Sequence, residues 1–289
     1  MFRIIALFGA ILISFSAIFV RLASVSPSTA AVGRTLYALP PLVIIWLAVR
    51  KRDDRKTRAR AIGFVAGMFL GIDLWFWHHA IDFIGAGLAT VLGNTQVIFV
   101  GAMAWLLHRE RPSRVAFLTI PIVFAGVVMI TGMGRPEAYG IDPIRGSLYG
   151  ILTGMSYATF LLVFRHSNRR LAHPAGPLLD ATLGAFSVSL LIALWEQNPD
   201  FHFTWPAHGW LIALALVSQV VGWLLISSAL PRLPALDTSV VLLLQPMMTV
   251  MWGRLIFGEA LSRLQWLGVL MVLGGVGSLS LLGATRSSE

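Results

Sequence analysis

The sequence predicts an all-α integral membrane protein with ten transmembrane helices, and three observations support this. Of the 289 residues, 57% are hydrophobic and only 12% are charged, and the mean hydropathy is +0.79. A water-soluble chain of this length needs more charge on its surface. The apolar residues fall into runs of about 20, the length that crosses a bilayer as a helix. The charged residues gather in the short segments between these runs.

The ten expected spans follow one another with short interruptions. They cover about residues 3–22, 30–49, 61–82, 85–107, 115–133, 145–165, 177–195, 207–230, 234–256 and 263–283. Connecting segments such as RKRDDRKTRAR, HRERPSR and RHSNRR are too short for a soluble catalytic or nucleotide-binding domain. The sequence has no G-x-x-x-x-G-K-[ST] motif, which argues against an ATP-driven pump and against an ATPase subunit.

The basic residues indicate how the chain is oriented. If the N-terminus is inside, sixteen of the 22 lysines and arginines lie in inner segments, most densely at residues 50–60. Because short inner loops are enriched in lysine and arginine, both termini are expected to be cytoplasmic, in the cell inner membrane. The net charge of +9 is then a topology signal, and we expect no nucleic-acid partner. The absence of cysteine excludes thiolate metal sites and disulfides.

The second half of the sequence resembles the first. The stretch AIDFIGAGLATVLGNTQVIFVGAMAWLLHRERPSRVAFLTIPIVFAGVVMITGMG begins at Ala80 and aligns without a gap with ALPRLPALDTSVVLLLQPMMTVMWGRLIFGEALSRLQWLGVLMVLGGVGSLSLLG, which begins at Ala229. Each repeat holds five spans, and an odd number makes the second repeat enter the membrane from the opposite side. We expect two inverted five-helix repeats, residues 1–134 and 145–284, that together form one membrane domain.

The stretch SALPRLPALDTSVVLLLQPMMTVMWGRLIFGEALSRLQWLGVLMVLGGV carries a family resemblance. Its small residues before the ninth span, the mid-span Pro246, the pair Gly258–Glu259 and the glycine-rich last span resemble the drug/metabolite transporter superfamily. Within it, the chain is most similar to the ten-helix EamA-type exporters. The aromatic and histidine content of the third span resembles that of bacterial aromatic amino-acid exporters. This resemblance implies an alternating-access exporter and no enzymatic activity.

The first half departs from the family pattern at two places. Val97 stands where the second half has Pro246, and Arg109 stands where it has the glycine of Gly258–Glu259. The first span also carries no acidic residue. Small multidrug-resistance relatives couple transport to protons through a carboxylate there, so the departure puts that route in doubt.

Polar side chains in the spans are the candidates for substrate binding, because polar groups in hydrocarbon tend to face a bundle interior or a water-filled cavity. Gln96 and Gln245 occupy equivalent positions of the two repeats, near the middle of the membrane. Their amides can bind a carboxylate or an amine, although amides also join helices to one another. The other candidates in these spans are Asn94, Tyr157 and Trp223.

The segment WFWHHA, residues 75–80, raises a separate question. Trp75 and His79 lie four residues apart and therefore share one helix face. We expect both to face the outer half of the cavity, where aromatic rings would form a wall for an aromatic ligand. The alternative is that they pack against neighbouring helices. His78 and His79 point about 100° apart and make a poor joint metal site, so we expect no metal and no cofactor.

Asp73 lies close to the centre of the third span. It is a candidate for proton coupling or for pairing with a substrate amine, and the alternative is a bond to a neighbouring helix. Gly63, Gly67 and Gly71 form a small-residue stripe on the same span, which is typical of close helix packing.

The function we expect is export of amino acids, aromatic or bulky apolar ones, and of related metabolites from the cytoplasm by alternating access. The cavity would be lined by spans one, three, four, six, eight and nine. Since one chain supplies both repeats, a monomer is expected to suffice, with a small-molecule substrate and the lipid bilayer as partners. The closest alternative is an exporter of lipophilic cationic drugs that uses Asp73. A membrane-embedded enzyme and a channel are further alternatives.

Overall fold

The computed structural model describes residues 2–108, 118, 121–122, 124–126, 128–129, 140–167, 173–196, 202, 204–229, 244–258 and 261–283. This part of the chain is helical throughout, apart from its connecting segments. Seven of its helical stretches are long and apolar enough to cross a membrane. The expectation of an all-helical, multi-pass membrane protein is therefore confirmed. The number ten stays a prediction, because most of the expected fifth span, 115–133, lies outside the described residues. Glu259 of the Gly258–Glu259 pair also lies outside them.

The helices follow the expected order. Those before the undescribed middle segment are α1 (Phe2–Ser14), α2 (Ser16–Ala23), α3 (Pro27–Val49), the short η1 (Arg50–Arg52), α4 (Thr57–Ile84), α5 (Ala86–Gly93) and α6 (Gln96–His108). Those after it are α8 (Pro143–Ser167), α9 (Ala175–Trp195), α10 (Ala207–Ala213), the π-helix η3 (Leu214–Gly222), α11 (Trp223–Ala229), α13 (Leu244–Phe257) and α14 (Arg263–Gly283).

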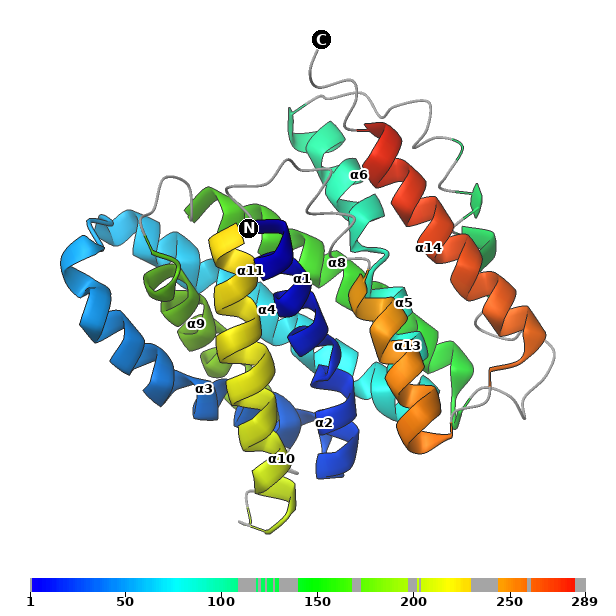
Figure 1. Ribbon diagram of the computed structural model, residues 1–289, viewed down its shortest axis with the longest axis horizontal. Helices are drawn as coiled ribbons and strands as arrows, with labels where there is room; N and C mark the ends of the chain where they lie inside the picture. Colours follow the sequence, from blue (N-terminus) through cyan, green and yellow to red (C-terminus); the bar gives the residue numbers. More distant parts are fainter. Residues whose placement is uncertain are drawn as a thin grey trace.

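The bundle has two groups of helices (Figure 1). One group holds α3, α9, α10 and α11, the other holds α5, α6, α13 and α14, and α1, α4 and α8 lie between them. α4 packs most extensively on α8 and α9, while α13 packs on α5 and α1. The two sequence halves are thus intertwined, so any central cavity is built from both.

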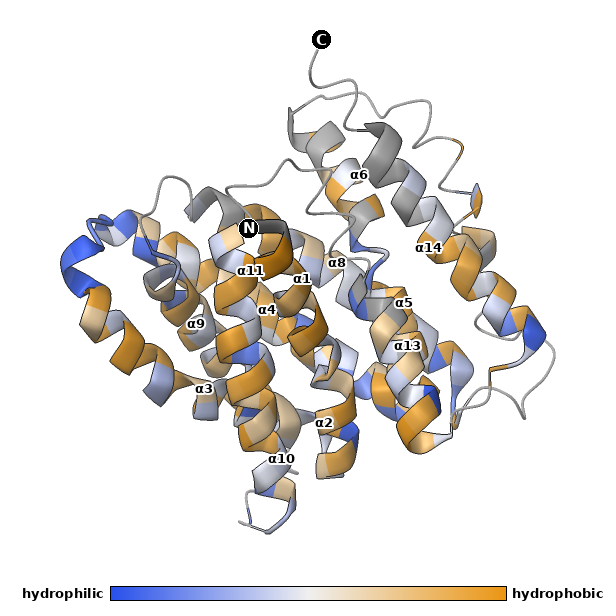
Figure 2. Ribbon diagram, in the orientation of Figure 1, coloured by the Kyte–Doolittle hydropathy of each residue, from blue (hydrophilic) through white to orange (hydrophobic). Residues whose placement is uncertain are grey.

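The outer surface of the bundle is apolar. Large hydrophobic side chains such as Ile44, Leu106 and Leu191 are more than 60% exposed. Figure 2 shows apolar residues along the helices and hydrophilic residues in the turn between α3 and α4. Such a surface suits hydrocarbon, and helices satisfy their own backbone groups there.

Two of the expected spans are broken. The first divides at Phe15 into α1 and α2, and the fourth divides at Asn94 and Thr95 into α5 and α6. Side chains satisfy the backbone carbonyls at these breaks: Thr249 Oγ1 donates to Ser14 O over 3.0 Å, and Thr95 Oγ1 donates to Leu92 O over 2.6 Å. Irregular backbone at membrane depth is tolerated where it is enclosed by protein or lines a cavity. The expected fourth span is present as a candidate membrane span, Ala86–Met103, with a turn at Asn94 and Thr95 inside it.

The glycine stripe of α4 lies against α9. A Cβ added at Gly67 would meet the Ala181 carbonyl oxygen at 1.8 Å, and one at Gly71 would meet the Ala185 oxygen at 2.7 Å. Only glycine lets the two backbones come this close. The expected packing role of the stripe is confirmed.

Polar contacts hold this helix pair together at both ends. Before α4 begins, Arg55 Nη1 donates to Asp180 Oδ2 of α9 over 2.7 Å. Toward the end of α4, Trp75 Nε1 donates to Oε1 of Glu196 over 2.7 Å, and Ser28 donates to the same carboxylate. α4 and α9 therefore run parallel as one closely packed unit.

Candidate functional site

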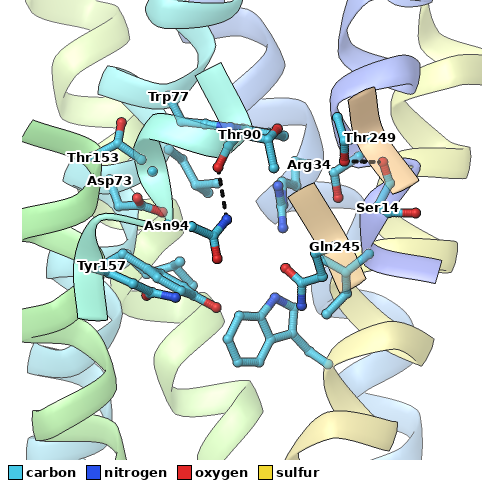
Figure 3. Close-up of a pocket in the computed structure, with 17 residues that line it drawn as sticks. Ser14, Arg34, Asp73, Trp77, Thr90, Asn94, Thr153, Tyr157, Gln245 and Thr249 are labelled. Carbon is cyan, nitrogen blue, oxygen red and sulfur yellow. Dashed lines mark hydrogen bonds between the residues drawn. The ribbon is translucent and has the colours of Figure 1, made fainter. Parts of the chain in front are cut away.

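A cavity opens where the broken helices meet (Figure 3). The space between its walls measures about 610 Å³, with open solvent included. The lining residues are Ile13, Ser14, Ser16, Arg34, Leu70, Asp73, Leu74, Trp77, Thr90, Gly93, Asn94, Gln96, Thr153, Tyr157, Trp223, Gln245 and Thr249. Each of the six spans expected to line a cavity contributes, and α3 adds Arg34.

Three side-chain amides converge on this cavity from its two sides. Asn94 and Gln96 belong to the break between α5 and α6, and Gln245 lies in α13. Asn94 Nδ2 donates to Thr90 O over 2.8 Å, a bond visible in Figure 3. Gln96 Oε1 and Gln245 Nε2 are buried and lack a hydrogen-bond partner among the described residues. A buried polar atom without a partner is costly, so these amides can offer an acceptor and a donor to a ligand.

The break near Asn94 owes its shape to local sequence and to α8. Gly93 ends α5, and the following side chains bond back to the last carbonyls of that helix. On α8, a Cβ at Gly154 would lie 2.5 Å from Thr95 Oγ1 and 3.0 Å from the Gln96 backbone nitrogen. The glycine therefore lets the turn pack closely on α8, which carries Thr153 and Tyr157 into the same cavity.

Aromatic rings form one wall of the cavity. Tyr157 and Trp223 pack edge to face with ring centroids 6.1 Å apart, and both rings pack against the Phe160 ring. The Trp223 Nε1 atom is buried without a partner among the described residues. Trp77 lines the cavity from α4. Ring faces beside a few polar groups suit an aromatic or bulky apolar ligand.

Two charged side chains of opposite sign also line the cavity. Arg34 of α3 is 4% exposed and Asp73 of α4 is 6% exposed. Arg34 Nε donates to Gln219 Oε1 over 2.8 Å, and its guanidinium lies 5.9 Å from the Trp77 ring centroid. In Figure 3 the Arg34 side chain points into the open centre of the cavity.

The structure brings together six of the eight site residues expected from sequence. Those in the cavity lining are Asp73, Asn94, Gln96, Tyr157, Trp223 and Gln245. Their binding of a substrate stays a prediction, as does the coupling role of Asp73.

Trp75 and His79 lie outside this cavity lining, so their expected position needs correction. They do pair with each other, with rings 5.0 Å apart, but Tyr149 packs against both. His79 Nε2 lies 3.5 Å from Glu196 Oε1. The reason is helical register: Trp75 and His79 continue the i, i+4 stripe of Gly67 and Gly71, which faces α9, and Asp73 is on another side of the helix.

Sequence reasoning missed the role of Arg34 and left Trp77 unassigned. Arg34 lies near the start of its expected span, 30–49, where a basic residue is typical of a topology signal. The usable signal was its setting in AAVGRT, where small residues allow close packing. A Cβ at Gly33 would lie 2.8 Å from Leu211 Cδ1, so this turn of α3 is enclosed by protein and Arg34 cannot lie in lipid. For Trp77 the signal was its spacing of four from Asp73.

His78 is fully buried, and its Nδ1 lies 3.2 Å from the Pro27 carbonyl oxygen. The described residues contain no group of three or more His, Cys, Asp or Glu side chains that could hold a metal ion.

Comparisons with known proteins give a consistent result. A model of the EamA-like transporter family matches residues 2–132 and again residues 144–281. An uncharacterized transporter of Synechocystis sp., sll1319, is 26% identical over 275 residues, covering 92% of this chain and 79% of the relative. The uncharacterized protein PA1977 of Pseudomonas aeruginosa is 28% identical over 241 residues, covering 81% and 78%. The uncharacterized transporter YwfM of Bacillus subtilis is 22% identical over 235 residues, covering 81% and 77%.

A solved crystal structure has the same fold. Its TM-score with this chain is 0.62 at 15% sequence identity, and the match covers 100% of this chain and 99% of that one.

Proposed function

Since this chain belongs to the EamA-like transporter family, we propose that it is a secondary transporter that exports amino acids, aromatic or bulky apolar ones, and related metabolites from the cytoplasm. The family makes it a multi-pass membrane transporter and not an enzyme. The substrate class, the direction of transport and the resemblance to aromatic amino-acid exporters are the proposed part.

The observation that carries the proposal is the meeting of amides and aromatic rings in one cavity between the two halves. Gln96, Asn94 and Gln245 supply donors and acceptors, while Tyr157 and Trp223 supply an apolar wall. A polar head group beside an apolar side chain is the chemistry of an aromatic or bulky amino acid.

The proposed mechanism is alternating access between inverted repeats, residues 1–134 and 145–284, with ten helices in all. The equivalent positions Gln96 and Gln245 support it, since both residues line the same cavity. Both halves contribute to the cavity, so rocking one half against the other would open it to either side. We propose cytoplasmic termini in a cell inner membrane, with one chain sufficient for transport.

A second candidate, export of lipophilic cationic drugs, rests on Asp73, whose carboxylate lines the same cavity. Arg34 opposes it, because a buried guanidinium in the same cavity repels a cation.

Counterflow in proteoliposomes separates the two candidates. Vesicles that hold the full chain are loaded with unlabelled phenylalanine or tryptophan, and entry of labelled amino acid is followed. Saturable accumulation supports the proposal. If no amino acid exchanges but lipophilic cations do, the drug-export candidate replaces it.

A further inference from the structure

Arg34 is held in place by protein at one edge of its guanidinium. Its Nε donates to Gln219 Oε1, and the other end of that amide, Nε2, donates to Thr182 Oγ1 over 3.4 Å. Gln219 is itself fully buried. This chain of bonds fixes the plane of the guanidinium. Its two terminal nitrogens form no hydrogen bond with the described residues and lie on the cavity side (Figure 3).

Asp73 is the opposite charge on the same cavity, and the two do not touch. Within the described part of the chain, no ion pair within 4.0 Å and no hydrogen bond joins the Asp73 carboxylate to Arg34. Each still lies within electrostatic range of the other. Both side chains are more than nine-tenths buried, so neither is fully solvated.

Opposite charges that are buried and kept apart lack the contact that would offset their loss of hydration. A ligand with an anionic group and a cationic group can compensate both at once. A guanidinium with two free terminal nitrogens fits a carboxylate with two parallel hydrogen bonds. A carboxylate in an apolar setting fits an ammonium group. A ligand with both an anionic and a cationic group meets Arg34 and Asp73 in their ionised forms, which favours a dipolar ligand over an acid or an amine alone.

We propose that Arg34 binds the carboxylate of a zwitterionic substrate and that Asp73 binds its ammonium group. This assignment rests on the proposed function. It adds which two groups of the substrate the cavity binds and how the substrate is oriented between the helices. The carboxylate lies toward α3 and the ammonium toward α4. The side chain is left to the aromatic wall formed by Tyr157 and Trp223.

The test compares three competitors of labelled phenylalanine in counterflow by the full-length wild-type chain. Phenylalanine carries both charges, its methyl ester lacks the carboxylate, and N-acetylphenylalanine lacks the ammonium. We expect each analogue to compete about 10- to 100-fold more weakly than phenylalanine, the loss expected for a missing hydrogen bond to a charged group.

Variants assign each loss to one residue. In Arg34→Gln the advantage of phenylalanine over its methyl ester disappears, while its advantage over N-acetylphenylalanine remains. In Asp73→Asn the pattern reverses. Arg34→Lys keeps the charge without the paired hydrogen bonds and is expected to retain part of the preference. Arg254→Gln, which changes an exposed arginine of α13, is the matched control and alters neither ratio.

The outcomes separate this inference from the function beneath it. If wild type exchanges phenylalanine but the analogues compete equally well, or Arg34→Gln keeps the full preference, the inference falls and the proposed function stands. If amino acids do not exchange but another zwitterion such as glycine betaine does, and Arg34→Gln abolishes it, the inference stands and the proposed function falls. If only cations exchange, both fall. Should Arg34→Gln fail to fold, Arg34→Lys and the wild-type competitors decide.

Discussion

The two faces of α4 differ in how they treat polar groups. One face carries Gly67 and Gly71, packs against α9 and leaves almost no space. At its beginning, Arg55 bonds to Asp180 over 2.7 Å and to both carboxylate oxygens of Asp53 over 2.7 and 2.9 Å. The opposite face carries Asp73 and lines the cavity.

Buried arginine and aspartate side chains therefore occur in two arrangements, in direct contact at one place and separated at the other. The Arg55 side chain is 2% exposed and its charged partners are in direct contact. Arg34 is about as deeply buried, but its opposite charge in the cavity is not in contact. A pair of opposite charges in direct contact stabilises a helix contact, and a separated pair can bind a ligand. The face of α4 toward α9 is therefore structural, and the face toward the cavity can bind a ligand.

The largest expected effect is the loss of Arg55. Arg55→Ala leaves the carboxylates of Asp53 and Asp180 without their buried cation, which costs about 3–5 kcal/mol of stability. Thermal unfolding in detergent measures this. Arg58→Ala removes an exposed arginine nearby and is the control. If both variants melt alike, the charged contact at this end of α4 is not structural.

A backbone contact gives the next largest effect. Gly67→Ala puts a methyl group where the Ala181 carbonyl oxygen lies, 1.8 Å away, and α4 must move off α9. Overpacking of this kind costs about 1–3 kcal/mol. Gly101→Ala is the matched control, because no atom lies within 4 Å of the added Cβ. Equal melting temperatures for the two variants would mean that the helices are not in close contact.

Substituting one polar residue on each side of the comparison separates binding from stability. Gln245→Ala removes a cavity amide and should weaken counterflow by about 1 kcal/mol, roughly fivefold. Trp75→Phe keeps an aromatic ring but removes the indole N–H that donates to Glu196, and it should lower stability by at least about 1 kcal/mol with binding unchanged. Saturation curves and melting curves of both variants are the measurements. A binding defect in Trp75→Phe alone would restore Trp75 to the cavity.

Neutralising Asp73 should not destabilise the protein. Asp73→Asn removes a buried carboxylate that no described residue contacts, so we expect the variant to be at least as stable as wild type. Asp180→Asn, which weakens a direct ion pair, should destabilise the protein more. If the two variants unfold in the reverse order, the separated and contacting pairs have been assigned to the wrong faces.

A further effect is the pH dependence that arises from Asp53, which lies between the spans. Hydrogen bonds from the Arg55 guanidinium lower its pKa from 3.8 to about 2, and the Trp46 N–H assists. Because the folded pKa is the lower one, the stabilisation is complete above about pH 4 and is lost as pH falls through 2. The stability gap between wild type and Asp53→Asn should be constant from pH 8 to about 5 and close below that range. A gap that closes near neutral pH would contradict this assignment.

The sequence predicts the position of a side chain well where helical spacing alone decides it. The prediction is poor where the residue composition of a segment suggests a different position. The glycine stripe and the pairing of Trp75 with His79 follow from spacing alone, and both are present. The same spacing puts those rings on the α9 side, which the aromatic content of WFWHHA obscured. Arg34 was assigned to topology, because its position near a span end resembles that of an anchoring charge.

The sequence by itself determined the membrane class and the approximate positions of the spans that the structure describes, because hydropathy along the chain is a local property. It also named six of the cavity-lining residues, since a polar group in hydrocarbon must find a polar or hydrated neighbour. Only the tertiary structure decided which face of α4 meets α9 and which meets the cavity. It also decided that Arg34 reaches the cavity and that the fourth span breaks at Asn94. These features depend on contacts between helices far apart in the chain, which local spacing narrows but does not fix.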